Sequence, residues 1–136
     1  MLWALALTLG SAAVFEDIRS RHIPNWITAG AFCAALLYHG ISRGFAGLAA
    51  ASLGALIGFG IFLVFYCLGA MGAGDIKLMA AFGALLGPSG ILIAALLAAI
   101  IGAALAAGAA AWSRRPAIPY APAIVLGAWL ALLGKG

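Results

Sequence analysis

Residues 45–68 read FAGLAAASLGALIGFGIFLVFYCL, a run of 24 positions without a charged side chain. A helix needs about 20 apolar residues to cross the hydrocarbon core of a bilayer. In lipid the backbone groups of such a run find no water to bond, so they must satisfy one another within a helix. The stretch therefore predicts a transmembrane helix in the middle of the chain.

The rest of the chain has the same character. Of its 136 residues, 67% are hydrophobic and 7% are charged, whereas roughly a quarter of the residues in a soluble domain are charged. The net charge of +4 forms no basic patch, because the seven bases are spread over several connections. These numbers exclude a soluble globular protein, a nucleic-acid-binding protein and a disordered chain, and they predict an integral membrane protein.

Five further apolar stretches flank residues 45–68, separated by polar or Gly/Pro-containing segments. We therefore expect an all-α polytopic membrane protein, with residues 1–136 forming one domain, a bundle of six transmembrane helices. The N-terminal stretch lacks the basic region of a signal peptide, so we interpret it as a retained helix. The expected helices cover residues 2–15, 26–39, 45–68, 76–86, 91–112 and 120–133.

The basic residues indicate how the six helices are oriented. The connections after the first, third and fifth helices hold five Lys or Arg residues, and the opposite side holds two. Because basic residues are enriched in cytoplasmic loops, we expect the first group in the cytoplasm and both termini outside. The first group is Arg19, Arg21, Lys77, Arg114 and Arg115, and the second is Arg43 and Lys135.

Two other features have simple structural interpretations. Cys33 and Cys67 lie in apolar runs without neighbouring Cys or His ligands, so we expect free, buried thiols and neither a zinc site nor a disulfide. Gly54 and Gly58 form a GxxxG pair, which is typical of closely packed helices. We attribute this pair to packing within the bundle, and keep the face of a homodimer as the alternative.

The chain has only three acidic residues, Glu16, Asp17 and Asp75. Ionisable residues in membrane segments are costly and are usually functional. The expected topology places Asp17 and Asp75 on the same cytoplasmic side, although 58 positions separate them in the sequence. Glu16 lies about 100° around the helix from Asp17, so we do not expect it to share their site.

Two carboxyl groups held together can hydrolyse a peptide bond. The ionised group deprotonates a water molecule, while the protonated group polarises the scissile carbonyl and later donates to the leaving amine. Gly72 and Gly74 precede Asp75, and we expect them to give the backbone unusual φ/ψ freedom and to let a substrate strand approach closely. Each acid also has a structural interpretation. Asp75 suits a helix N-cap, and Asp17 suits an ion pair with Arg19 or Arg21.

The segments around the two aspartates resemble motifs of the type IV prepilin peptidases. Asp17 is followed after five residues by IPN at 23–25, and Asp75 lies in GAGDIKL at 72–78, which is similar to the GxGD motif of that family. The segment IPYAPA at 118–123 is similar to the Pro-rich segment that opens the last helix of those enzymes. The resemblance covers nearly the whole chain.

The resemblance implies an aspartic endopeptidase of the intramembrane type, without metal or cofactor. It implies removal of the basic leader peptide from prepilins or pseudopilins at the cytoplasmic face of the bacterial inner membrane, with the single apolar helix of the substrate docking within the lipid. Asp17 and Asp75 would be the catalytic pair. The expected supporting residues are Gly72, Gly74, Lys77, Pro24 and Asn25.

Larger members of the family carry an N-terminal region with paired Cys motifs and a second activity, methylation of the new N-terminus. This chain resembles the short, peptidase-only form of Flp-type (tight-adherence) pilus systems, so we expect no methyltransferase activity. Two other functional classes remain as alternatives. One is a small transporter that relays protons through the aspartates, and the other is a structural subunit of pilus assembly in which both acids are caps.

Overall fold

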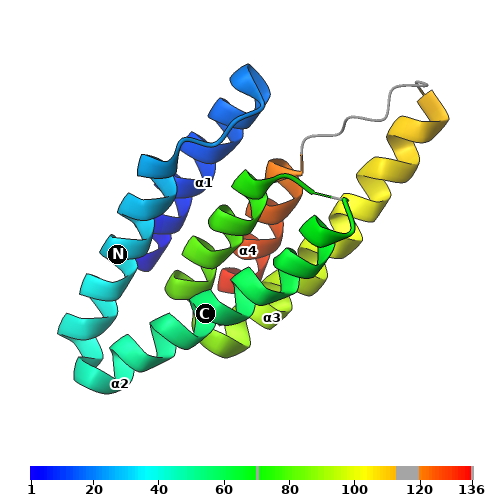
Figure 1. Ribbon diagram of the computed structural model, residues 1–136. Helices are drawn as coiled ribbons and strands as arrows, with labels where there is room; N and C mark the ends of the chain where they lie inside the picture. Colours follow the sequence, from blue (N-terminus) through cyan, green and yellow to red (C-terminus); the bar gives the residue numbers. More distant parts are fainter. Residues whose placement is uncertain (70, 113–119, 136) are drawn as a thin grey trace.

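Four α-helices make up the fold. The computed structural model describes residues 1–69, 71–112 and 120–135, and the regular secondary structure within these ranges is entirely helical (Figure 1). This confirms the predicted all-α class. The helices are α1 (Leu2–Ser20), α2 (Asn25–Cys67), α3 (Ala73–Trp112) and α4 (Ala121–Lys135).

Two of these helices bend sharply at a single glycine. Gly44 in α2 has a φ of 60° and Gly87 in α3 has a φ of 73°, a left-handed conformation that glycine adopts at little cost. Pro88 follows the second bend and begins a new straight segment, a position where its missing N–H is tolerated. Figure 1 shows α2 and α3 folding back on themselves at these bends.

The bends explain why four helices are found where the sequence analysis separates six. α2 consists of the straight segments 25–43 and 45–67, and α3 consists of 73–86 and 88–112. Each straight segment corresponds to one predicted apolar stretch. Gly44 and Gly87 have non-helical backbone angles, so the expected breaks between these stretches are present, each as a kink at one glycine rather than a longer loop.

The first straight segment of α3, residues 73–86, lies in the interior of the bundle. Its side chains Leu78, Met79, Phe82 and Leu85 are at most 2% exposed, and α3 contacts each of the other three helices. Asp75 therefore stands at the end of the most buried helical segment in the molecule.

The closest helix contact joins α2 to α3 at two glycines. A Cβ atom at Gly54 would overlap the backbone carbonyl of Gly83, and one at Gly83 would overlap that of Gly54. A Cβ at Gly58 would lie 2.6 Å from the carbonyl oxygen of Met79. The GxxxG pair therefore serves packing within one chain, as predicted, and its ridge is covered by α3 rather than open to a second copy.

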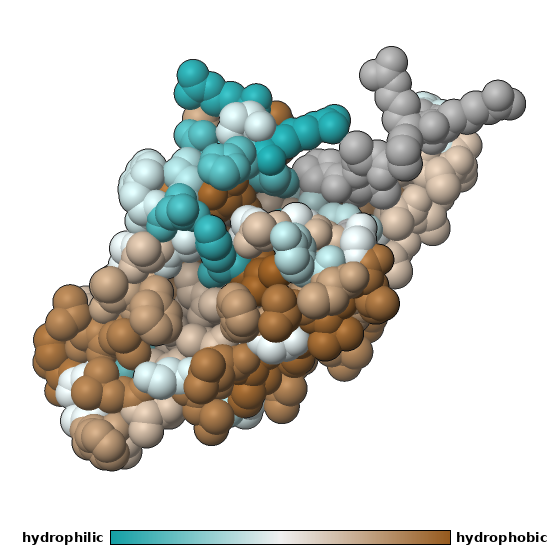
Figure 2. All heavy atoms as spheres, in the orientation of Figure 1, coloured by the Kyte–Doolittle hydropathy of each residue, from teal (hydrophilic) through white to brown (hydrophobic). Residues whose placement is uncertain are grey.

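Apolar side chains cover the outer faces of the helices. Trp26, Leu56 and Leu96 are each more than 60% exposed, and Figure 2 shows apolar surface over much of the visible face, with hydrophilic residues gathered where α1 leads into α2. α2 and α3 are each long and apolar enough to cross a membrane. The chain is therefore a membrane protein, with an outer surface suited to lipid.

Cys33 and Cys67 correct one expectation. Both are free thiols, as predicted, but both are exposed rather than buried. They lie on faces of α2 that the other helices leave uncovered. Apolar surroundings in the sequence do not distinguish the interior of a membrane protein from its lipid-facing surface, because both are apolar.

We predict that Gly54→Val lowers the free energy of unfolding by about 2 kcal/mol or more, because the new side chain forces α2 away from α3. Gly60→Val in the same helix is the matched control, since a Cβ at Gly60 meets nothing within 4 Å. Thermal unfolding in detergent measures both variants. Equal destabilisation by the two substitutions contradicts the close contact of the two helices.

Candidate active site

The structure brings Asp17 and Asp75 together from different helices. Asp17 lies in the last turn of α1 and Asp75 in the first turn of α3. Each is only 9% exposed, and Asp17 lies close enough for its charge to act on Asp75. The two carboxyl groups therefore form one buried acidic pair, as the expected topology requires, across 58 positions of sequence.

The carboxyl group of Asp75 is held by the backbone of its own motif. The N–H of Gly72 donates to Asp75 Oδ2 over 3.3 Å, and the N–H of Asp75 donates to the Gly72 carbonyl over 3.2 Å. This reciprocal pair closes the first turn of α3 in the manner of half a capping box, with Asp75 at the third helical position. The capping interpretation of Asp75 is therefore correct in part, and capping fixes the direction of its carboxyl group.

The carboxyl group of Asp17 faces the beginning of α4. It accepts a hydrogen bond from the backbone N–H of Ala121, and the charge of Arg21 also acts on it. The first N–H groups of a helix have no partner within the helix, so they are available to an acid. Asp17 Oδ2 is buried and has no hydrogen-bond partner in the part of the chain that the structure describes.

The predicted supporting residues meet beside the aspartates. Lys77 Nζ donates a 2.7 Å hydrogen bond to Asn25 Oδ1, which ties the first turns of α3 and α2 together. Pro24 precedes α2 in an extended conformation, with φ −61° and ψ 138°. Ile23 is 3% exposed, and a Cβ at Gly74 would lie 3.4 Å from its Cβ, an ordinary contact. The IPN segment and the GAGD segment therefore adjoin each other directly.

The two motif glycines correct a second expectation. Neither Gly72 nor Gly74 has a positive φ, whereas Gly69, which precedes the motif, has a φ of 75°. Ala73 begins the helix, with Gly72 before it and Gly74 as its second residue, and both glycines are held in conformations that other residues also adopt. The unusual backbone angle falls at Gly69 because the chain turns there before α3 begins. Close approach of a substrate to these glycines stays a prediction.

The remaining predicted residues are placed as follows. Arg43 and Lys135 line one cavity at the end of the bundle opposite the aspartates, which agrees with the two predicted groups of bases. Glu16 is partly exposed, unlike its neighbour Asp17. Arg114 and Arg115 lie outside the described residues.

Sequence reasoning missed two contributors to this arrangement. The Ala121 amide carries no side-chain signal, and only the Pro-rich segment 118–123, which resembles the opening of the family's last helix, pointed to this part of the chain. His39 is 7% exposed, and its Nε2 lies 3.0 Å from the Leu85 carbonyl next to the bend in α3. Its place in an apolar run gave no indication that it supports the bend.

Comparison with known proteins gives the family. The model of the Type IV leader peptidase family matches residues 3–107. Two similar proteins are named Prepilin leader peptidase/N-methyltransferase, one from Aeromonas hydrophila and one from Aeromonas salmonicida strain A449. Each is 32% identical over 143 aligned positions, which cover 97% of this chain. The chain therefore belongs to the Type IV leader peptidase family, and the predicted resemblance is confirmed.

The chain spans 49% of the length of these two relatives. No solved structure matches it. The family membership therefore rests on the sequence of nearly the whole chain, and the geometry of the acidic pair comes from its own structure.

We predict that Lys77→Met and Asn25→Leu each lower the free energy of unfolding by about 1 kcal/mol, because each removes the same charge-assisted hydrogen bond. The double variant then loses no more than the larger single effect. Chemical denaturation of the four proteins in detergent gives the coupling free energy. Fully additive losses contradict a bond between the two side chains.

Proposed function

We propose that this chain is an aspartic endopeptidase that removes the basic leader peptide from prepilins or pseudopilins, with Asp17 and Asp75 as its catalytic pair. The observation that carries the proposal is the pair itself, two buried carboxyl groups from different helices that interact electrostatically. Membership of the Type IV leader peptidase family and the names of the relatives support the substrate class.

The surroundings of the two carboxyl groups suggest how they divide the work. Burial disfavours negative charge on Asp17, and the Ala121 amide and the Arg21 charge partly offset this effect. The charge of Asp17, by contrast, further disfavours negative charge on Asp75, so we assign Asp17 as the base. It takes a proton from water, the water oxygen bonds to the scissile carbonyl carbon, and Asp75 gives its proton to the carbonyl oxygen. The C–N bond then breaks. In contrast to the division of roles expected from the sequence, Asp17 passes its proton to the leaving amine, and Asp75 recovers a proton from the hydroxyl group.

The lengths of the two straight segments of α3 support a site below the membrane surface. From the bend at Gly87, residues 88–112 extend about 37 Å and residues 73–86 about 21 Å, at 1.5 Å per residue. Residues 75–86 extend about 18 Å from the bend, so the apolar end of α3 lies about 19 Å farther from the bend along its segment than Asp75 does. An apolar segment of this length suits lipid, which supports the proposal that the aspartates cleave within or near the bilayer.

We infer the membrane arrangement from the same segments. The four straight segments of α2 and α3, together with α1 and α4, give six membrane-crossing elements. The more basic end, with the acidic pair, then faces the cytoplasm of the bacterial inner membrane, and both termini face outward. Lipid is the surrounding solvent, and the prepilin is the partner that enters the site.

The second activity in the relatives' names is not part of this proposal. The expected absence of methyltransferase activity stays a prediction, because the chain covers only 49% of those proteins.

We predict that Asp17→Asn or Asp75→Asn reduces leader cleavage by about a thousandfold or more, because each removes one of the two proton-transferring groups. The purified protein is incubated in detergent with a Flp-type prepilin, and cleavage is followed as a shift in electrophoretic mobility. Glu16→Gln is the matched control, since it neutralises the third acid without touching the pair, and it keeps the wild-type rate.

The same assay separates the proposal from its alternatives. Wild-type cleavage by either Asn variant contradicts the catalytic pair. Proton-coupled flux in liposomes, without any cleavage, favours a transporter. Normal pilus assembly by both Asn variants favours a structural subunit.

A further inference from the structure

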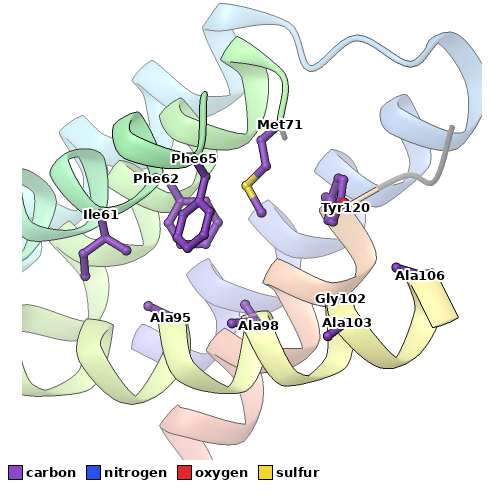
Figure 3. Close-up of a pocket in the computed structure, with 11 residues that line it drawn as sticks. Ile61, Phe62, Phe65, Met71, Ala95, Ala98, Gly102, Ala103, Ala106 and Tyr120 are labelled. Carbon is purple, nitrogen blue, oxygen red and sulfur yellow. The ribbon is translucent and has the colours of Figure 1, made fainter. Parts of the chain in front are cut away.

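An apolar groove lies between the ends of α2, α3 and α4 (Figure 3). Its volume is about 250 Å³. α2 contributes bulky side chains, the second straight segment of α3 contributes only alanine and glycine, and Tyr120 lies at the start of α4. We call this the lateral groove, and its lining is Ile61, Phe62, Phe65, Met71, Ala95, Ala98, Ala99, Gly102, Ala103, Ala106 and Tyr120.

One end of the lateral groove adjoins the acidic pair through two backbone neighbours. Met71 is next to Gly72, whose N–H bonds Asp75. Tyr120 is next to Ala121, whose N–H bonds Asp17. Neighbouring Cα atoms are about 3.8 Å apart, so this end of the groove lies one residue away from each of the two amides that bond the carboxyl groups.

The other end of the groove runs away from the aspartates along α3. The Tyr120 ring lies beside Gly102, because a Cβ at Gly102 would lie 3.5 Å from the ring. From Gly102 to Ala95 the groove descends about 10 Å, or two helical turns. Figure 3 shows Phe62 and Phe65 on the opposite wall, pointing toward this row of small residues.

The lining fits an apolar helix rather than a polar ligand. None of the side chains that line it within the described part of the chain is charged. Rows of alanine and glycine let a second helix approach the backbone of α3 closely, which is how helices associate in lipid. Phe65, Ala99 and Ala103 are exposed, so the groove opens laterally on the lipid-facing side of the bundle.

We propose that the lateral groove binds the first two turns of the apolar helix of the substrate, so that the peptide bond preceding this helix is presented to Asp17 and Asp75. This inference rests on the proposed function and deepens it, because it assigns a surface to the substrate helix. In a prepilin the basic leader, the cleavage point and the apolar helix follow one another along the chain. In this arrangement the apolar helix lies in the groove, the cleavage point lies at the acidic pair, and the leader extends beyond it.

A second surface groove provides the comparison. It lies between α1 and α2 and is lined by Leu5, Thr8, Leu9, Ala12, Trp26, Ile27, Gly30, Ala31 and Ala34. It has a similar apolar lining, but none of these residues is next in sequence to Gly72 or Ala121, whose amides bond the aspartates. Both grooves suit a lipid acyl chain, and only the lateral groove leads to the acidic pair.

The test fills each groove with the same side chain. We expect Ala103→Phe to raise the KM for a Flp-type prepilin in liposomes about tenfold, with kcat little changed. Ala34→Phe fills the comparison groove and leaves both constants at wild-type values. Similar effects of the two substitutions, or none from Ala103→Phe, overturn the assignment and indicate that lipid fills both grooves.

Cross-linking separates this proposal from the proposed function. Asp75→Asn prevents turnover, Cys33→Ser and Cys67→Ser remove the native thiols, and a cysteine is introduced by Ala99→Cys, Ala103→Cys or Ala34→Cys. The probe is the same prepilin with one cysteine in the first two turns of its apolar helix.

Disulfide formation with Ala99→Cys and Ala103→Cys, and not with Ala34→Cys, upholds the groove, even if the wild-type protein proves unable to cleave. Cleavage by wild type without these cross-links overturns the groove alone, and a cross-link through Ala34→Cys reassigns the helix to the comparison groove.

Discussion

The backbone contact between Gly54 of α2 and Gly83 of α3 is the constraint on which the rest of the structure depends. No side chain separates the two helices there, so the first straight segment of α3 sits deep within the bundle and carries Asp75 to a buried position. A Cβ at this point displaces α3 relative to α1, and with it one carboxyl group relative to the other. Because catalytic groups tolerate little misplacement, helix packing far from the aspartates sets their geometry.

Both aspartates are oriented by backbone amides at the beginnings of helices. Gly72 supplies an N–H at the start of α3, and Ala121 supplies one at the start of α4. The N-terminal amides of a helix are without partners and carry partial positive charge, so they stabilise a carboxylate that water reaches poorly. The supports come from helix ends that the bundle must contain in any case.

The sequence allowed prediction of the helical class, the apolar stretches and the grouping of Asp17 with Asp75. These follow from backbone hydrogen bonding in lipid and from the distribution of seven bases and three acids. The breaks at Gly44 and Gly87 were expected, but their form, a kink at one glycine, escaped prediction, because a glycine within an apolar run is equally compatible with a bend and with a turn between helices. The exposure of Cys33 escaped it as well, since hydropathy does not separate protein-facing from lipid-facing positions.

The Ala121 amide and the burial of His39 depend on how distant segments pack, and no local pattern encodes them. The motif glycines illustrate the same limit. The motif correctly predicted that Gly72 and Gly74 lie beside Asp75. It did not predict that the positive φ would fall at Gly69, before the motif.

The central claim is that Asp17 and Asp75 act together on one peptide bond of the substrate. The most direct measurement is the affinity of a prepilin peptide whose scissile bond is replaced by a hydroxyethylene group, which mimics the tetrahedral intermediate. We expect tight binding to the wild-type protein and to Glu16→Gln, and an affinity loss of about a hundredfold or more with either Asp17→Asn or Asp75→Asn. Unchanged affinity in either Asn variant contradicts a shared catalytic pair.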